Sequence, residues 1–350
     1  MPIIGITKHQ YYYQPKGKRP GRRASVTTFR KQGLKMTEES NAQVVQRIVD
    51  IQSGPETDYG YRKMYFALML LGYYINHKKV YRLMKQNNLL KKRYKHSGKT
   101  YAKYRIVTPK GPLEVLEMDI KYIWVTQARR HAFILSIIDT FTRAILHWQL
   151  GFTMKSAQVK QAWEQIIANY LQPADLLSKD VHIEVRNDNG PQFASKLIRK
   201  FFNENYLNQV FTHPYTPQEN GHIESFHSIL SRALGNQPFW DIPELENRLE
   251  IFYHKYNNVR LHGSIANLPP ALFWKLWDEQ KIKRKVLENK KVKFTLNVPY
   301  QQLSGNGSLK GVSCLNNHPL GAVDYLQKEA YGPETLQQPS VQRSPSVVPC

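Results

Sequence analysis

Apolar and polar residues alternate between positions 116 and 124, which predicts a β-strand. Leu116, Met118, Ile120, Tyr122 and Trp124 alternate there with Glu117, Asp119, Lys121 and Ile123. This strand has one apolar face and carries an acid midway along the other. Apolar runs at residues 133–138 and 144–150, joined by a short turn, predict two more strands. Together the three runs predict an antiparallel meander.

Farther along the chain, helical patterns alternate with short strand patterns. We expect helices at residues 155–170, 193–205, 218–234 and 243–256, and strands at 182–186 and 209–212. A meander followed by alternating helices and strands predicts a mixed α/β sheet flanked by helices. A further strand is possible at residues 292–298, in a basic segment.

Three helices are expected before the sheet, at residues 37–53, 61–71 and 77–87, with Thr37 as the N-cap of the first. In the third, Lys78, Arg82 and Lys85 share one face and apolar residues share another. A short turn before a basic amphipathic helix is typical of a helix-turn-helix. The alternative is a small helical bundle with a solvated lysine face.

The formal net charge of +23 indicates a polyanionic partner, and its distribution favours nucleic acid. Residues 1–105 hold 23 Lys and Arg against five Asp and Glu, whereas residues 106–280 are nearly neutral. Seven basic residues of the helical region are predicted to contact DNA: Lys78, Lys79, Arg82, Lys85, Lys91, Lys92 and Arg93. Apolar segments are too short to predict a membrane span. The two cysteines provide no disulfide framework, which fits a reducing cytoplasm.

Three acids stand in contexts that favour a metal site. Asp119 interrupts an apolar strand, where a charge is costly unless it is paired or bound to metal. Asp188 follows a predicted strand and precedes Asn-Gly-Pro, and Glu224 lies near the start of a predicted helix. The alternatives are an edge-strand aspartate, a turn-capping aspartate and a solvated helix glutamate.

Five segments then carry a resemblance: EMDIKYI, IIDTFTRAILHW, RNDNGPQF, HPYTPQENGHIESFH and YNNVRLHGSIANLPP. In this order they resemble bacterial insertion-sequence transposases of the retroviral-integrase superfamily. The resemblance is specifically to the downstream-frame (orf B) product of the IS-three type. Residues 57–92 also resemble that family's helix-turn-helix region. The resemblance implies an RNase H-like integrase core in which Asp119, Asp188 and Glu224 are the catalytic, metal-binding triad.

With this resemblance we expect five regions along the chain. They are a basic flexible arm (1–36), a helix-turn-helix DNA-binding region (37–105), a linker (106–112), the integrase catalytic core (113–280) and a basic, partly disordered tail (281–350). The chain departs from the family at two positions. Lys121 replaces a frequent Thr, and Ser231 followed by Arg232 replaces a frequent basic residue, so Lys121 and Arg232 are further predicted DNA contacts.

Other acids and histidines have more ordinary interpretations. Asp139 is expected to cap the turn after its strand, and Glu117 is a less favoured substitute ligand. His227 is expected to be a surface histidine, and Arg260 and His262 suit structural roles as well as DNA contacts.

The predicted function is metal-dependent cleavage and strand transfer of double-stranded DNA at insertion-sequence ends, with two Mg²⁺ (or Mn²⁺) ions held by the carboxylates. We expect a homo-oligomer on DNA. Because the chain's start resembles the end of an upstream-frame helix-turn-helix, we also expect fusion to, or action with, the orf A product. The alternatives are a nuclease that cuts without joining, and a non-catalytic helix-turn-helix regulator or inactive element copy.

Overall fold

The computed structural model describes residues 5, 7–14, 24–54, 57, 59–91, 108–212, 220–235, 238–288 and 292–305. Its central feature is a five-stranded sheet with the order β6-β5-β4-β7-β8. The strands are β4 (Val115–Val125), β5 (Arg130–Asp139), β6 (Ile145–Gly151), β7 (Ile183–Asn187) and β8 (Leu207–Phe211). The first three pair antiparallel, and β7 and β8 join in parallel. The predicted meander and the mixed, RNase H-like sheet are confirmed.

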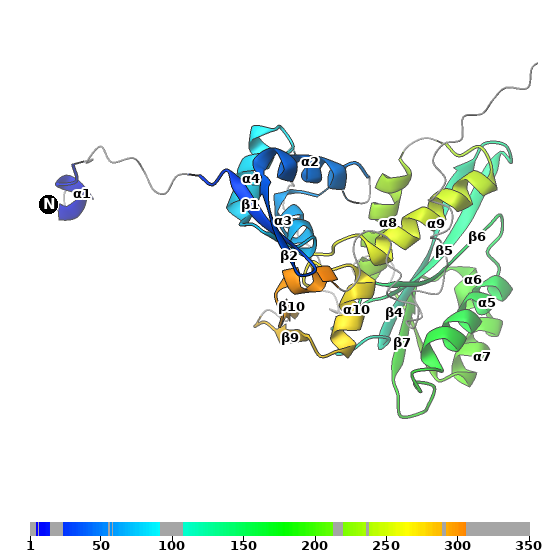
Figure 1. The fold of residues 1–350 in the computed structure, drawn as a ribbon. Coiled ribbons are helices and arrows are strands. Elements are labelled where there is room, and N and C mark those ends of the chain that lie inside the picture. The colour runs from blue at the N-terminus through cyan, green and yellow to red at the C-terminus, as the bar shows by residue number, and fades with distance from the viewer. Residues whose placement is uncertain are drawn as a thin grey trace, which may run out of the picture.

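Helices cover both faces of this sheet (Figure 1). One face packs against α5 (Ser156–Ile166), continued by a π-helical turn at Ile167–Leu171, and against α6 (Pro191–Ala194) and α7 (Lys196–Glu204). The other face packs against α8 (Gly221–Leu234) and α9 (Ile242–Asn258). The predicted helix at 193–205 is divided at Ser195, whose backbone is extended and whose Oγ accepts from the Ile198 N–H to cap α7.

Burial along β4 differs from the expected alternation at its far end. Leu116, Met118 and Ile120 are buried as predicted, whereas Tyr122 and Trp124 are 56% and 44% exposed. The two rings lie instead against Phe133 and His131 of the neighbouring strand. The apolar face therefore faces the core only along the first part of the strand, where helices cover it.

The N-terminal part contains a β-hairpin that the sequence did not predict. Strand β1 (Thr27–Gln32) pairs with β2 (Lys35–Ser40) and with the two-residue β3 (Tyr73–Tyr74). The expectations of a flexible arm at residues 27–36 and of a helix beginning at Thr37 are wrong. Helix α2 (Asn41–Gln52) begins after Ser40, and α3 (Tyr61–Leu70) and α4 (His77–Gln86) follow close to their predicted bounds. A short helix, α1 (Lys8–Tyr11), precedes the hairpin.

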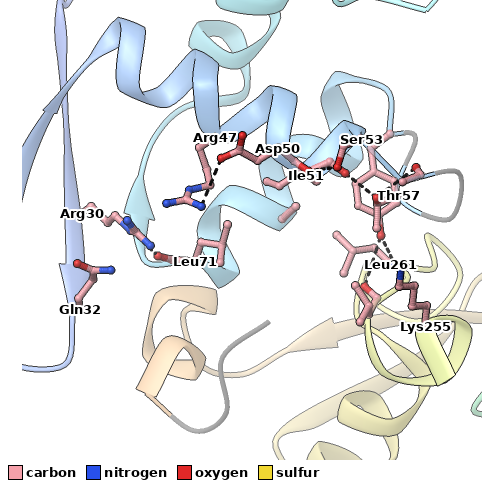
Figure 2. Close-up of a pocket in the computed structure, with 14 residues that line it drawn as sticks. Arg30, Gln32, Arg47, Asp50, Ile51, Ser53, Thr57, Leu71, Lys255 and Leu261 are labelled. Atoms are coloured by element: carbon pink, nitrogen blue, oxygen red, sulfur yellow. Dashed lines mark hydrogen bonds and ion pairs between the residues drawn. The ribbon is translucent and has the colours of Figure 1, made fainter. Parts of the chain in front are cut away.

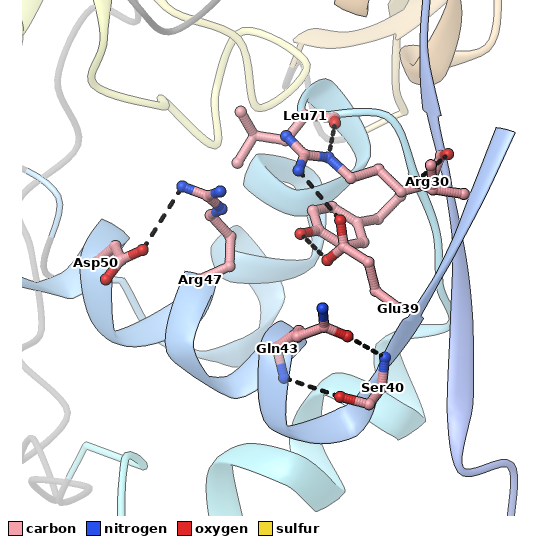
Figure 3. A network of polar contacts seen from close by, with 9 residues as sticks. Arg30, Glu39, Ser40, Gln43, Arg47, Asp50 and Leu71 are labelled. Carbon is pink, nitrogen blue, oxygen red and sulfur yellow. Dashed lines mark hydrogen bonds and ion pairs between the residues drawn. The ribbon is translucent and has the colours of Figure 1, made fainter. Parts of the chain in front are cut away.

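Polar contacts at the end of β2 explain why the helix starts late (Figure 3). Ser40 and Gln43 form a reciprocal capping box at the N-terminus of α2. The Glu39 carboxylate accepts from Arg30 at 3.1 Å and from the Tyr73 hydroxyl at 2.6 Å. These partners fix residues 37–40 as a strand, because two of them come from the other strands of the sheet.

The C-terminal segment folds back onto the N-terminal helices. Helix α10 (Pro270–Asp278), strands β9 (Ile282–Val286) and β10 (Val292–Leu296) and a 3₁₀ turn at Tyr300–Gly305 contribute to one core with α2, α3 and α4. The strand at 292 was predicted, but α10 and β9 were not. Residues 282–305 are thus part of the fold rather than of a tail. No helix within the described ranges is long and apolar enough to cross a membrane.

Candidate active site

The parallel pairing of β4 with β7 brings two of the predicted triad residues to neighbouring positions. Val115, Leu116 and Glu117 pair with Glu184, Val185 and Arg186, respectively. Continuing this register by two residues places Asp119 opposite Asp188, which directly follows β7. Because paired strands lie roughly 4.8 Å apart, the two carboxylates share one neighbourhood. The Asp188 Oδ1 accepts from the Gly190 N–H at 3.0 Å, which orients this carboxylate.

Helix α8 carries the third acid, Glu224, on the same side of the sheet. Its buried residues Ile223, Phe226 and Leu230 pack toward α9, which leaves Glu224 exposed beside the strands. Burial and the charge of Asp119 both raise the pKa of Glu224, and they raise the pKa of Asp188 in the same way. Asp119 therefore lies close enough to interact electrostatically with both Asp188 and Glu224.

His227 lies one turn after Glu224 and contacts Asp119, so the expectation of a surface histidine is wrong. The His227 Nδ1 is 3.3 Å from the Asp119 Oδ2, and the histidine side chain is only 12% exposed. The other oxygen of Asp119 accepts from the Ile120 N–H at 2.8 Å. The helical spacing of Glu224 and His227 was the available signal, since residues three apart share a helix face.

Glu117 and Asp139 are buried acids whose carboxylates accept backbone hydrogen bonds within the fold. Burial raises the pKa of Glu117 to about 7, while the Ile223 N–H and two nearby arginines oppose this shift. Asp139 is fully buried and accepts from the N–H and hydroxyl of Thr142 and from the N–H of Leu113. The prediction that Asp139 caps the turn after β5 is confirmed.

The oxygen donors are of the kind that Mg²⁺ and Mn²⁺ prefer, because they are carboxylates. The repulsion of Asp119 with Asp188 and with Glu224 would be relieved by a divalent cation. Within the described ranges, however, no three His, Cys, Asp or Glu side chains stand close enough to hold a metal ion. The residue types thus fit a divalent ion, and coordination by all three requires movement of a side chain.

Two of the residues predicted to contact DNA donate hydrogen bonds to other parts of the protein instead. The Lys79 Nζ donates to the Thr27 carbonyl at 2.6 Å and to the Thr28 hydroxyl at 2.7 Å. The Arg82 Nη2 donates to the Ser25 carbonyl at 2.9 Å. Both side chains hold the β1 segment against α4, so in this structure they are directed toward the hairpin.

The other predicted contacts differ in exposure. Exposed side chains are found at Lys78, Lys85, Lys91 and Arg232, and Lys121 is partly exposed. Lys92 and Arg93 lie outside the described residues. His262 is buried against the Tyr256 ring and has a pKa well below its usual value because of burial, which favours its structural interpretation.

A cavity of about 460 Å³ lies away from the carboxylates, between the helix-turn-helix region and the end of α9 (Figure 2). Arg30, Arg47 and Asp50 line one side, and Thr57 and Lys255 line the other. Close by, the Leu261 N–H donates to the Tyr59 hydroxyl at 2.9 Å. The cavity therefore lies at an interface between the two regions that includes this hydrogen bond.

Comparison with known proteins agrees with this architecture. Residues 109–217 and 205–270 match two family models, each described as an integrase core domain, and residues 37–97 match an HTH-like domain. An insertion element IS476 uncharacterized 39.2 kDa protein of Xanthomonas euvesicatoria is 26% identical over 217 residues, covering 61% of this chain and 60% of that protein. The putative transposase InsK for insertion sequence element IS150 of Escherichia coli is 24% identical over 241 residues, covering 65% and 82%.

Among solved structures, a chain of the simian T-cell lymphotropic virus intasome in complex with PP2A regulatory subunit B56 gamma aligns with a TM-score of 0.40 and 15% identity. The alignment covers 67% of this chain and 74% of that one. The chain therefore contains segments that match an integrase core domain, preceded by a segment that matches an HTH-like domain, and it is similar to proteins of bacterial insertion elements, a putative transposase among them.

Proposed function

We propose that this chain is a DNA transposase that cleaves phosphodiester bonds and transfers DNA strands at the ends of an insertion element. The proposal is supported by the fact that Asp119, Asp188 and Glu224 all fall within segments that match integrase core models. Asp119 and Asp188 follow one parallel register, and Glu224 lies within electrostatic reach of Asp119. Named relatives include the putative transposase for IS150 and a transposase for IS904 of Lactococcus lactis.

The three carboxylates are proposed to hold divalent metal, Mg²⁺ or Mn²⁺, as two ions. When bound, such ions act as Lewis acids toward the oxygens of a phosphodiester undergoing displacement. A core domain of HTLV-2 integrase has been solved in complex with magnesium. The protein's own part is to supply hard oxygen ligands and to orient them. Glu224 is exposed, so rotation of its side chain can bring its carboxylate toward Asp119.

The proposed reaction has two displacements at phosphorus. Water first attacks a phosphodiester, and the bond to the 3′ oxygen breaks, which frees a DNA 3′-OH. That hydroxyl then attacks a second phosphodiester, and the oxygen that leaves takes up a proton. Neither displacement needs a covalent bond between protein and DNA, in keeping with a site whose reactive groups are carboxylates rather than a serine or tyrosine nucleophile.

Double-stranded DNA is the proposed partner, at both the element ends and the target. Lys78 and Lys85 project from α4 of the helix-turn-helix region, and Lys91 and Arg232 are also exposed. Contacts between such side chains and phosphates dominate the affinity of DNA-binding proteins. Because two element ends are joined together, we propose a homo-oligomer on DNA, acting with or fused to the upstream-frame product.

The test is a Mg²⁺-dependent assay on labelled DNA that carries the ends of the chain's own element, run with and without the upstream-frame fusion. We expect joined products from the wild type and none from Asp119→Ala, Asp188→Ala or Glu224→Ala, all of which should still bind DNA. Glu246→Ala is the matched control, since Glu246 is an exposed acid on α9. Cleaved but unjoined DNA would indicate a nuclease, and activity retained in any triad variant would overturn the assignment.

A further inference from the structure

Glu117 links the strand that carries Asp119 to the helix that carries Glu224. Its Oε2 accepts from the backbone N–H of His222 at 3.0 Å and from that of Ile223 at 2.8 Å. The Glu117 side chain is fully buried. The two donors are the second and third residues of α8, which are separated from Glu117 by more than 100 positions in the sequence.

These two N–H groups are the ones that an N-cap side chain ordinarily satisfies. Asn220 stands at the N-cap of α8 but makes no side-chain capping hydrogen bond. The Glu117 carboxylate takes this role from the neighbouring strand, and its negative charge is favoured at the N-terminal end of the helix. Local capping would fix only the start of α8, whereas capping from β4 also fixes the helix against the sheet.

Both residues that form this contact are close in sequence to a proposed metal ligand. Glu117 is two residues before Asp119 on β4, and the side chains of residues two apart point to the same face of a strand. Ile223 is adjacent to Glu224 on α8. One pair of hydrogen bonds therefore sets the distance between the backbone of Asp119 and the backbone of Glu224.

We propose that Glu117 is a positioning residue for the metal site, which holds α8 so that Glu224 and Asp119 can bind the same cation. This inference rests on the proposed function, since it assigns Glu117 a part in that site. The Glu117 Oε2 is occupied by two backbone donors of α8, so this oxygen positions the helix rather than a cation. Groups that orient metal ligands commonly alter metal affinity by about 10–100-fold when they are removed.

Asp139 provides a matched control, because it is also a fully buried carboxylate that accepts backbone N–H bonds. Its partners lie in the turn after β5 and at Leu113, and none of them is on α8. Loss of Asp139 should lower stability without loosening α8. A purely structural role for Glu117 would make the two variants alike in metal dependence.

The experiment measures the Mg²⁺ concentration that gives half-maximal strand transfer by the full-length wild type, Glu117→Ala, Glu117→Gln and Asp139→Ala. We expect Glu117→Ala to need about 10–100-fold more Mg²⁺. Glu117→Gln should be closer to the wild type, because its amide oxygen can accept the same two N–H bonds. Asp139→Ala should keep the wild-type Mg²⁺ requirement. An unchanged requirement in Glu117→Ala, or an equal shift in Asp139→Ala, would overturn the proposal.

Amide hydrogen exchange in the wild-type chain provides a second measurement that needs no variant. We expect the His222 and Ile223 amides to exchange slowly, whereas uncapped amides in the first turn of a helix exchange fast. Fast exchange at both would overturn the proposal even if Glu117→Ala failed to fold. A wild type without Mg²⁺-dependent products, combined with slow exchange at these amides, would contradict the proposed function but leave the contact between Glu117 and α8 in place.

Discussion

Phe226 anchors α8, the helix that carries Glu224, and its replacement by alanine should lower both stability and activity. The ring is 1% exposed. It lies edge-on to Tyr256 at 4.9 Å between ring centroids, and 5.7 Å and 5.9 Å from Tyr253 and Phe252. These partners are themselves buried side chains of α9, so they have little room to close around a cavity.

The expected magnitude follows from this enclosure. Replacement of a buried Phe by Ala costs about 3–5 kcal/mol, with the larger values where the site cannot collapse. Each aromatic pair contributes roughly 0.5–1.5 kcal/mol beyond its buried area, and Phe226 has three such pairs. We therefore expect Phe226→Ala to lower the free energy of unfolding by about 4–5 kcal/mol, a large part of the roughly 5–15 kcal/mol of a typical domain.

Urea unfolding followed by circular dichroism measures this loss, and strand transfer below the unfolding transition measures the effect on the site. The neighbouring Ser225 is exposed, so Ser225→Ala is the control and should change stability by no more than about 0.5 kcal/mol. A loss below about 1 kcal/mol in Phe226→Ala would show that this face does not anchor α8. Full activity in a strongly destabilised Phe226→Ala chain would show that the position of α8 does not govern the reaction.

Three further predictions concern the Tyr59–Leu261 hydrogen bond, the metal and a partly buried lysine. Tyr59→Phe should lower the free energy of unfolding by about 1–3 kcal/mol in urea, because the Leu261 N–H loses its acceptor; an unchanged midpoint would refute this. Mg²⁺ at ten times its Kd should raise the free energy of unfolding of the wild type by about 1.4 kcal/mol, and that of Asp188→Asn by much less. An equal increase in both proteins would contradict this prediction. Lys63 has its pKa lowered to about 8 by burial and nearby cations. The wild type should therefore gain stability as pH rises above 8, where folded Lys63 loses its proton before the unfolded chain does. Lys63→Met should then raise Tm more at pH 7 than at pH 9, relative to the exposed-site control Lys85→Met, and equal gains would contradict the reasoning.

Residue patterns predicted the sheet and most helices well, because burial imposes a local period on each element. The β4 strand shows the limit of this reasoning. Its alternation gave the strand and placed Asp119 on the face opposite the main core, but it did not reveal that Tyr122 and Trp124 are exposed. Their exposure depends on where the covering helices end, which is a property of the whole fold.

Long-range partners account for the errors in the N-terminal region. Residues 37–40 suit a helix start by composition, yet they pair with β1 and contact Tyr73. In the same way, Lys79 and Arg82 were predicted to contact DNA, but Lys79 donates to the hairpin and Arg82 to the Ser25 carbonyl just before it. Neither outcome can be derived from helical periodicity, since the hairpin that competes for these groups is not local to them.

The candidate site likewise combines features that the sequence predicted with features that only the structure reveals. Context and resemblance were sufficient to propose Asp119, Asp188 and Glu224, whereas the parallel register that aligns the first two appears only in the sheet. His227 and Glu117 were given lesser roles because their partners lie about 105 residues away. Buried polar side chains of this kind are identified by their contacts rather than by sequence pattern.

The most direct test of the central claim is to locate Mn²⁺ by anomalous diffraction in crystals of the full chain bound to DNA that carries the element's ends. We predict anomalous peaks within coordination distance of the Asp119 and Asp188 carboxylates, with Glu224 turned toward them. Mn²⁺ bound at other residues, with none near Asp119 and Asp188, would contradict the assignment of these carboxylates as the catalytic metal site.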